Sequence, residues 1–425
     1  MNAPILIAAI ATLLRLGLSF SYHQNTYDWG SVRGQALASE VDYLKTGIME
    51  LTDSQQYLRL GRSILARGAY GWDGRQSTFR PPGYPLLIAL CGASVPVLLV
   101  VQALLGGLTV FLAGLLALRW FGRAAGIAAA ALCAIDIPSL FYSGLVMSEA
   151  LFAALVLAAL AAFMLRRCTW SGLALGFAAL VRPVGLVLFV PFVVALLCRR
   201  EWKRAVLFAL LFALLPVAWV ARNAVLFHRR AFTSNGAFNL LYADAAALKA
   251  EREGIPRDSA RTLVAARYGA PYRGSNPLEL AGQLEHAALG IISRQPVRYA
   301  VLVVRGIGWT MLGTKSDELV AQLTSGSTSG AAASIGTRLR SGGGAERLTV
   351  LGLSAIEILM TLGALALALL GLLRRRVRRH TLLPLAVAAC LVLAVGPFTD
   401  GRFRVPVMPL IYLSAAAVFV HRRTP

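Results

Sequence analysis

Residues 94–118 form the uncharged apolar run SVPVLLVVQALLGGLTVFLAGLLAL. With 25 residues it is longer than the roughly 20 that a helix needs to cross a bilayer. Similar runs recur along most of the chain, and the 425 residues are 57% hydrophobic and 15% charged. A soluble domain has about half apolar and about a quarter charged residues. The sequence therefore predicts an all-α integral membrane protein.

The apolar runs predict about ten spanning helices. They lie at 3–21, 94–118, 124–143, 147–165, 170–182, 184–198, 205–226, 348–372, 382–398 and 404–421. The run at 170–182 is short for a span, so it is expected to be tilted or to form a broken hairpin with its neighbour. We expect a catalytic membrane core at 1–226 with a first outer loop at 22–93, an outer small domain at 227–347, and membrane helices at 348–425.

The short basic loops all fall on one side when the ten spans alternate across the membrane. These loops contain Arg119 and Arg123; Arg166 and Arg167; Arg199, Arg200, Lys203 and Arg204; Arg374, Arg375, Arg376, Arg378 and Arg379; and Arg422 and Arg423. Because basic loops are retained in the cytoplasm, both termini are predicted to be cytoplasmic, in a bacterial-type inner membrane. The first segment lacks a basic n-region and an Ala-x-Ala site, which predicts a retained span and not a signal peptide.

The formal net charge of +22 is explained by these loops and by attraction to anionic lipid or phosphate. We therefore expect membrane lipids, and no nucleic acid, as partners. Within the outer segment, residues 296–313 are amphipathic and the tract Ser325–Gly344 is typical of a mobile loop. The chain has no convincing internal repeat, which disfavours an inverted-repeat transporter.

The first outer loop contains a predicted amphipathic helix that begins at Asp53. Tyr57, Leu60 and Ile64 follow at helical spacing, and Gly68 is a C-terminal stop. Two roles remain open for Asp53. It could cap the helix N-terminus, or it could be a general base at the membrane surface. The two roles coexist only partly, because capping lowers basicity.

Several motifs occur in order along the chain. They are Asp53 with Tyr57, Arg80-Pro-Pro-Gly-Tyr84-Pro-Leu-Leu, Met147-Ser-Glu149-Ala-Leu-Phe, Val181-Arg182-Pro-Val-Gly, Ala221-Arg222-Asn, Thr233-Ser-Asn235-Gly-Ala-Phe-Asn and Gly401-Arg402-Phe-Arg404-Val-Pro. Together they resemble family 39-like glycosyltransferases of the GT-C superfamily, a group that includes protein O-mannosyltransferases and lipid A aminoarabinose transferases. The resemblance implies a GT-C-type helical bundle whose outer loops contain amphipathic helices. It also implies an inverting transfer from a polyprenyl-phosphate sugar at the extracytoplasmic face.

Carried over by position, Asp53 matches the catalytic carboxylate of the family. The sequence departs from the pattern at Ser54, where Glu is common. Another residue must therefore act as the second acid, or the protein has none. Glu149, at the predicted outer start of a span, is the candidate for it, with capping of that helix as the alternative. Tyr57, Tyr84 and Asn235 are the expected substrate-binding residues.

Arginines at predicted outer boundaries are candidates to bind the donor phosphate, whose negative charge grows as the bond to the sugar breaks. They are Arg80, Arg182, Arg222, Arg402 and Arg404. For any single arginine the alternative is a side chain that extends from a helix end to the lipid head groups. Arg404 and Arg222 match the family motifs most closely.

Other features have weaker functional implications. Arg15 is expected to reach the outer interface or an acidic partner, Asp136 to line the cavity or cap a helix, and Glu357 to have either a structural or a functional role. The five cysteines show no CxxC pair, the five histidines do not cluster, and the chain has no P-loop, HExxH or Rossmann motif. No metal ligand is assigned. A divalent cation held by carboxylates remains open, although Ser54 weakens that case.

The sequence thus predicts a glycosyltransferase that moves a sugar from a polyprenyl-phosphate carrier to a hydroxyl of a lipid, glycan or protein acceptor. Two alternatives remain: a transporter or flippase of a lipid-linked saccharide, and a non-catalytic membrane subunit with the same fold. The transporter would not need a base at Asp53.

Overall fold

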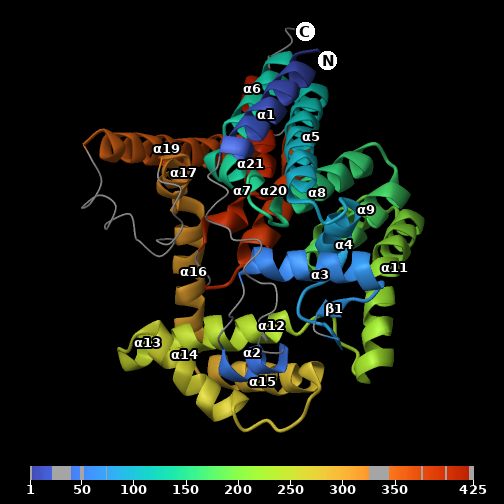
Figure 1. Ribbon diagram of the computed structural model, residues 1–425. Helices are drawn as coiled ribbons and strands as arrows, with labels where there is room; N and C mark the ends of the chain where they lie inside the picture. The colour runs from blue at the N-terminus through green and yellow to red at the C-terminus, as the bar shows by residue number, and fades with distance from the viewer. Residues whose placement is uncertain are drawn as a thin grey trace.

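The computed structural model shows an almost entirely helical protein (Figure 1). It describes residues 2–21, 40–47, 52–72, 74–324, 344–374, 377–397 and 400–420. Within these residues the strands are limited to β1 and β2, which pair antiparallel with Gly71 opposite Gln76. The predicted all-α fold class is confirmed.

The elements follow one another as α1 (Asn2–Ser21), α2 (Glu40–Thr46), α3 (Asp53–Arg67), β1 (Gly71–Trp72), β2 (Arg75–Gln76), α4 (Gly83–Leu90), α5 (Val95–Phe121), α6 (Arg123–Ala134), α7 (Ile137–Ser143), α8 (Glu149–Met164), α9 (Cys168–Val181), η2 (Pro183–Leu186), α10 (Phe189–Cys198), α11 (Trp202–Phe227), α12 (Asn235–Asn239), η3 (Leu240–Ala245), α13 (Ala246–Glu253), α14 (Arg257–Val264), η4 (Ala265–Gly269), α15 (Pro277–Ile292), α16 (Pro296–Leu312), α17 (Ser316–Thr324), α19 (Gly344–Leu373), α20 (Arg378–Leu393), η5 (Gly401–Arg404), α21 (Met408–Ala415) and η6 (Ala416–Phe419). Of the short turns, η3 and η4 are π-helical and the others are 3-10 helices.

Four of the described helices, α1, α5, α11 and α19, are long and apolar enough to cross a membrane. The count rises to six if α6 with α7, bent by 53°, and α15 with α16, bent by 102°, each form one span. Each of the ten predicted runs contains helix, but α8, α9, α10 and α21 belong to shorter apolar segments. Prolines contribute to the shortening, since Pro138 and Pro183 each begin a new helical segment. The chain is therefore multi-pass, and its described part contains fewer full-length spans than the predicted ten.

Parts of the predicted outer loops and tails lie outside the described residues. This holds for positions 22–39, for the predicted mobile tract as far as residue 343, and for Arg422 and Arg423. Gly344, the last residue of that tract, begins α19.

Glycines allow the helices of the bundle to approach closely. A Cβ at Gly172 would lie 2.8 Å from the backbone oxygen of Phe208, and one at Gly176 would lie 2.5 Å from that of Phe212. Small residues at helix contacts are the usual way for membrane helices to gain packing energy, because lipid supplies no hydrophobic drive between them. The α9–α11 contact, which ends beside Arg182, therefore depends on these two glycines.

Basic loops from different parts of the chain meet at one end of the bundle. The rings of Trp120 and His380 stack at 5.4 Å, Arg374 donates to the carbonyl of Val418 at 2.9 Å, and Arg166 pairs with Glu201 at 3.0 Å. These contacts join loops that the alternating topology assigns to a common side. Which compartment that side faces remains a prediction.

The helices α12 to α15 form a second cluster below the bundle, together with α2 (Figure 1). Its buried core includes Leu44 of α2, Phe238 and Tyr242 of the α12–η3 segment, and Leu280 and Leu284 of α15. The two predicted outer segments therefore pack on each other, and α16 leads from the cluster back toward the bundle. This places the α12–η3 segment opposite the ends of α3 and α8.

Arg15 and Asp136, both buried in the bundle, have hydrogen-bond partners that the sequence did not identify. Arg15 donates to the carbonyls of Ala11 and Cys133 at 3.1 and 3.2 Å, and the charge of Asp136 also acts on it electrostatically. Asp136 caps α7 by accepting from the backbone N–H of Ser139 at 3.1 Å, and it also accepts from the hydroxyl of Tyr412 at 2.9 Å. The capping alternative for Asp136 is therefore the correct one.

Candidate active site

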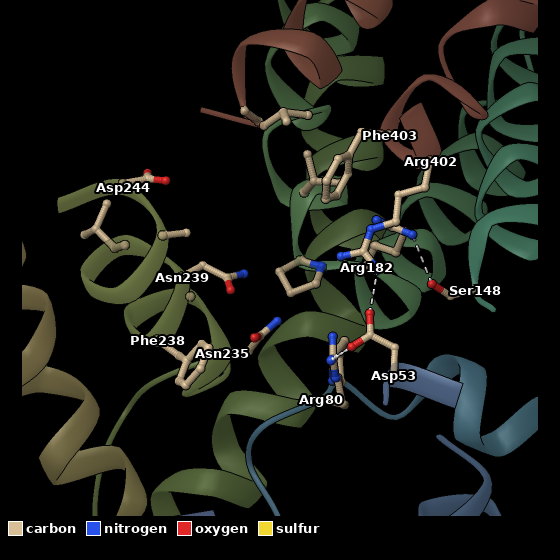
Figure 2. A pocket seen from close by; sticks show the side chains of 18 of the residues that line it. Asp53, Arg80, Ser148, Arg182, Asn235, Phe238, Asn239, Asp244, Arg402 and Phe403 are labelled. Atoms are coloured by element: carbon tan, nitrogen blue, oxygen red, sulfur yellow. Dashed lines mark hydrogen bonds and ion pairs between the residues drawn. The ribbon is translucent and has the colours of Figure 1, made fainter. Parts of the chain in front are cut away.

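A cavity of about 560 Å³ lies between the bundle and the α12–η3 segment (Figure 2). It is at the opposite ends of the bundle helices from the basic loops, since it meets the first residue of α8 and the residue that follows α9. On the bundle side its lining includes six of the ten predicted site residues. They are Asp53, Tyr57, Arg80, Glu149, Arg182 and Arg402, and Asn235 joins them from the opposite wall.

Seven of the ten predicted site residues thus face one cavity, six of them on the bundle side and Asn235 on the other. The sequence separates these residues by as many as 349 positions, the distance along the chain from Asp53 to Arg402. Their convergence is a property of the folded chain.

Helix α3 presents Asp53 to the cavity from its first turn. The N-cap is Thr52, whose hydroxyl accepts from the backbone N–H of Gln55 at 3.4 Å, while the Gln55 side chain accepts from the backbone N–H of Thr52 at 2.9 Å. This capping box satisfies the free helix N–H groups. Gly68 ends the helix with a left-handed φ of 61°, as expected. The capping role considered for Asp53 is therefore wrong, and its carboxylate is available for other contacts.

Each oxygen of the Asp53 carboxylate pairs with a different arginine. Oδ1 accepts from Arg80, and Oδ2 accepts from Nη1 of Arg402 at 2.6 Å. Burial would raise the pKa of Asp53, but the positive charges of Arg80 and Arg402 outweigh it and hold the pKa well below its ordinary value. The carboxylate is therefore ionised in this arrangement, and it is a poor proton acceptor while both arginines hold it.

Arg80 is held from several sides. Its Nε donates to Oε1 of the fully buried Gln56 at 3.0 Å, and its guanidinium lies 5.3 Å from the centre of the Tyr57 ring. The Tyr57 hydroxyl in turn lies 3.4 Å from Oγ of Ser148, at the start of α8. Because α3 and α8 both begin here, the positive ends of two helix dipoles also face this side of the cavity.

Glu149 forms the second carboxylate centre of the cavity. Its Oε1 pairs with Arg182, which also donates to Oγ of Ser148 at 3.2 Å. Glu149 is only 1% exposed, and among the described residues its Oε2 has no hydrogen-bond partner. The capping alternative for Glu149 does not account for this geometry, since the side chain reaches across to the end of α9.

Positive charge exceeds negative charge on this side of the cavity. Arg80, Arg182 and Arg402 stand against the two carboxylates, and Figure 2 shows the three guanidinium groups gathered around Asp53. Buried arginines with a surplus of one positive charge favour an anion, and the planar guanidinium suits phosphate oxygens. The cluster is thus suited to bind a phosphate group.

Three predicted site residues do not line the cavity. Tyr84 is buried and donates to Gln102, and Arg222 donates to the carbonyl of Ser77 at 2.9 Å beside the β1–β2 hairpin. Arg404, only 1% exposed, pairs with Glu357 at 2.5 Å. These three residues, although they match the motifs, make contacts within the protein and not in the cavity. Glu357 likewise has the structural role that was one of its two expected roles.

The cavity also contains polar residues that the sequence did not single out, chiefly Asn239 and Asp244 of the α12–η3 wall. Asp244 is a lone acid in the alanine-rich stretch LLYADAAALKA at 240–250, and this isolation is the signal that was available. A π-helical turn such as η3 often marks a functional position, but no sequence pattern predicts it.

The described residues contain no group of three or more His, Cys, Asp or Glu side chains arranged to hold a metal ion. Both carboxylates on the bundle side are paired with arginines, which compete with a divalent cation for the same oxygens. The residues present therefore fit an anion better than a cation.

The fold and the cavity together define a multi-pass, helical membrane protein with an arginine-rich pocket at one end of its bundle. No known family model matches the sequence, and no curated protein matches it. Solved structures do resemble it, at low sequence identity.

One is the oligosaccharyltransferase AglB of Archaeoglobus fulgidus in complex with an inhibitory peptide and a dolichol-phosphate, with 14% identity and a TM-score of 0.46 over 98% of this chain and 50% of that one. Another is ArnT of Cupriavidus metallidurans bound to undecaprenyl phosphate, with 18% identity and a TM-score of 0.42 over 98% of this chain and 76% of that one. The chain spans about half the length of the archaeal enzyme. These are distant similarities, and the functional proposal depends on the residues of the cavity itself.

Proposed function

We propose that the protein transfers a sugar from a polyprenyl-phosphate carrier to an acceptor hydroxyl. The observation that supports this most strongly is the composition of the cavity. Its bundle side combines three arginines and two carboxylates, and the cavity also has an apolar side, at one end of a membrane-embedded bundle. A lipid-linked sugar phosphate matches this cavity: its anionic phosphate suits the arginines, and the phosphate lies between a sugar and an apolar chain.

The arginine cluster is the proposed phosphate site. Arg80, Arg182 and Arg402 would hold the phosphate and stabilise the charge that develops on it as the bond to the sugar breaks. The N-terminal ends of α3 and α8 would contribute in the same direction.

The carrier chain would leave the cavity along its apolar side. Val184 and Val187 line this side next to η2, and Leu391 and Val395 line it at the end of α20. Val187 is 42% exposed, so this side is not closed by protein there. A prenyl chain at this place would replace the contact of these side chains with the surrounding lipid.

Asp53 is the proposed general base. The acceptor oxygen would attack the anomeric carbon, the bond from that carbon to the phosphate oxygen would break, and Asp53 would take the hydroxyl proton. With both oxygens held by arginines its basicity is low. An incoming phosphate would compete for Arg80 and Arg402, and loss of these contacts would raise the pKa of Asp53 toward a useful range. Glu149 would position Arg182 and contribute to the charge balance.

The active site is proposed to face the extracytoplasmic side of the inner membrane. The cavity lies at the opposite helix ends from the joined basic loops, and the positive-inside rule assigns those loops to the cytoplasm. Labelling of single cysteines introduced on either side of intact cells tests this orientation. Accessibility of a cysteine near Trp120 from outside the cell would overturn it.

A transfer assay tests the reaction. Purified full-length protein receives a panel of radiolabelled polyprenyl-phosphate sugars and a membrane extract as the acceptor source, and wild type is compared with Asp53→Asn. Label that moves to a lipid, glycan or protein only with wild type supports the proposal. No transfer by folded protein that still binds the carrier would instead favour a flippase or a non-catalytic subunit.

A further inference from the structure

The wall of the cavity opposite the arginine cluster has a different chemistry. It is built by α12 and η3, and Figure 2 shows Asn235, Asn239 and Asp244 on this side, facing the arginines across the cavity. The wall also includes Phe238, so amide, carboxylate and aromatic side chains stand together on one short segment.

Of the three polar side chains Asn235, Asn239 and Asp244, two have no hydrogen-bond partner among the described residues. Among the described residues, the side-chain amides of Asn235 and Asn239 make no hydrogen bond, and Asn239 is exposed to the cavity. Asp244 accepts one hydrogen bond, from the hydroxyl of Tyr299 at 2.9 Å, and forms no ion pair within the described part of the chain. A carboxylate with no cationic partner at a partly buried position costs folding free energy, which a ligand would offset.

The position of Asp244 is closely determined by its surroundings. Tyr299 of α16 holds Oδ2, and the turn after α20 approaches from another side, where a Cβ on Gly396 would lie 3.2 Å from the same oxygen. Gly396 has a left-handed φ of 67°, so this close passage suits a glycine. Burial raises the pKa of Asp244 to about 6, so the carboxylate is ionised and accepts hydrogen bonds at neutral pH.

We propose that Asn235, Asn239 and Asp244 form a subsite for a glycosyl group, with Asp244 accepting hydrogen bonds from its hydroxyls. This subsite rests on the proposed function, because it is the wall that faces the proposed phosphate site and would hold the sugar. Amide side chains can both donate to and accept from a sugar hydroxyl, and a carboxylate accepts from two. These three side chains suit a polyhydroxylated ring and include no cation for a second phosphate. Arg261, which also lines the cavity, donates from Nε to the carbonyl of Tyr242 at 3.2 Å.

The hydroxyls could belong to the donor sugar or to a glycan acceptor, and binding measurements distinguish the two. The full-length protein in lipid nanodiscs is titrated with undecaprenyl phosphate and with undecaprenyl phosphate carrying mannose, glucose, galactose or a pentose. The variants are Asp244→Asn, which keeps the shape of the side chain, and Asn239→Ala, which removes an exposed side chain and should not affect folding. Glu251→Gln is the matched control, since Glu251 pairs with Arg305 on the exposed surface and does not line the cavity.

If the donor sugar occupies the subsite, Asp244→Asn binds the best glycosylated carrier about 10- to 100-fold more weakly than wild type, as expected for loss of a hydrogen bond to a charged group. Asn239→Ala, which loses a neutral hydrogen bond, binds it about 2- to 12-fold more weakly. The affinity of both variants for the bare carrier is unchanged, as are both affinities in Glu251→Gln. If a glycan acceptor occupies the subsite, carrier affinities are unchanged and the KM for the extracted acceptor rises by a similar factor.

Unchanged carrier affinities and an unchanged KM in both variants overturn the subsite while leaving the proposed function intact. Failure of wild type to bind even the bare carrier overturns the proposed function, and the subsite with it. The two failures are therefore distinguishable.

Discussion

Replacing Asp53 by asparagine should separate carrier binding from catalysis. In the structure both Asp53 oxygens occupy arginines that the phosphate is proposed to use. A phosphate that enters must therefore weaken two charge-assisted hydrogen bonds. Asparagine keeps the shape and one acceptor oxygen but has no charge, so it competes less with the phosphate for the two arginines. We expect Asp53→Asn to bind the carrier more tightly and to transfer no sugar.

The magnitude follows from the kind of bond that is exchanged. A hydrogen bond that involves a charged group contributes about 1.5–3 kcal/mol. The arginine–carboxylate bond is charged on both sides and belongs at the top of this range, whereas the arginine–amide bond of the variant is charged on one side and belongs near the bottom. The difference of about 1–1.5 kcal/mol for one such bond corresponds to about 5- to 12-fold tighter binding of undecaprenyl phosphate. The assay is equilibrium binding of the labelled carrier to the full-length protein in nanodiscs, with turnover measured on the same samples.

Two further variants complete this comparison. Arg402→Gln removes a proposed phosphate ligand, so it should weaken carrier binding, in the direction opposite to Asp53→Asn. Arg305→Gln removes an exposed arginine outside the cavity and should change neither quantity. Unchanged or weaker carrier binding in folded Asp53→Asn would refute the competition between carboxylate and phosphate. Equal losses of carrier affinity in Arg402→Gln and Arg305→Gln would show that carrier binding depends only on the overall charge of the protein.

Three other predictions concern stability. Glu357→Gln leaves the buried Arg404 without its charged partner and should lower the free energy of unfolding by about 3–5 kcal/mol. The double variant Glu357→Gln with Arg404→Met should recover most of this stability. Equal destabilisation of the single and double variants in denaturant unfolding would contradict the ion pair's role. Burial raises the pKa of Asp244 from an ordinary 3.8 to about 6, so the folded state binds a proton more tightly than the unfolded state and stability falls as pH rises from about 4 through 6. The pKa shift corresponds to a stability difference of about 3 kcal/mol between low and high pH. Because the side chain is partly exposed to solvent, we expect about half of this effect. Asp244→Asn should therefore stabilise the protein by that amount at pH 8 and not at pH 4. A lower melting temperature of Asp244→Asn at pH 8 would argue against this. Thr52→Ala removes the capping box of α3 and should cost about 1 kcal/mol in thermal unfolding, and an unchanged melting temperature would show that the cap contributes nothing.

Features that depend on local sequence were predicted well. The helix from Asp53 to a stop at Gly68 was expected from the spacing of apolar residues and from the glycine, and α3 has these bounds. The same reasoning left a capping role open for Asp53, but Thr52 performs it. A polar residue at either position satisfies the sequence pattern, and only backbone geometry distinguishes the N-cap from the first helical residue.

Features that depend on long-range contacts were predicted only in part. The motifs placed Arg80, Arg182, Arg222, Arg402 and Arg404 in one group of boundary arginines. Of these, Arg222 contacts the β1–β2 hairpin instead. For the other four, taken in chain order, the outcome differs. The structure brings the first three to the cavity and buries Arg404 against Glu357, from a different helix. A single sequence does not show which carboxylate an arginine meets, because that depends on how the helices pack.

The sequence by itself determined that this chain is an all-α membrane protein, because burial in lipid requires long apolar helices and these are visible in composition alone. It also identified the helix that begins at Asp53 and most of the charged residues of the cavity. Only the tertiary structure decided that Asp53 is held between two arginines and that Asp244 faces them from the opposite wall. The physical reason is that the chemistry of a carboxylate depends on the charges and the solvent around it, and those are supplied by segments distant in the chain.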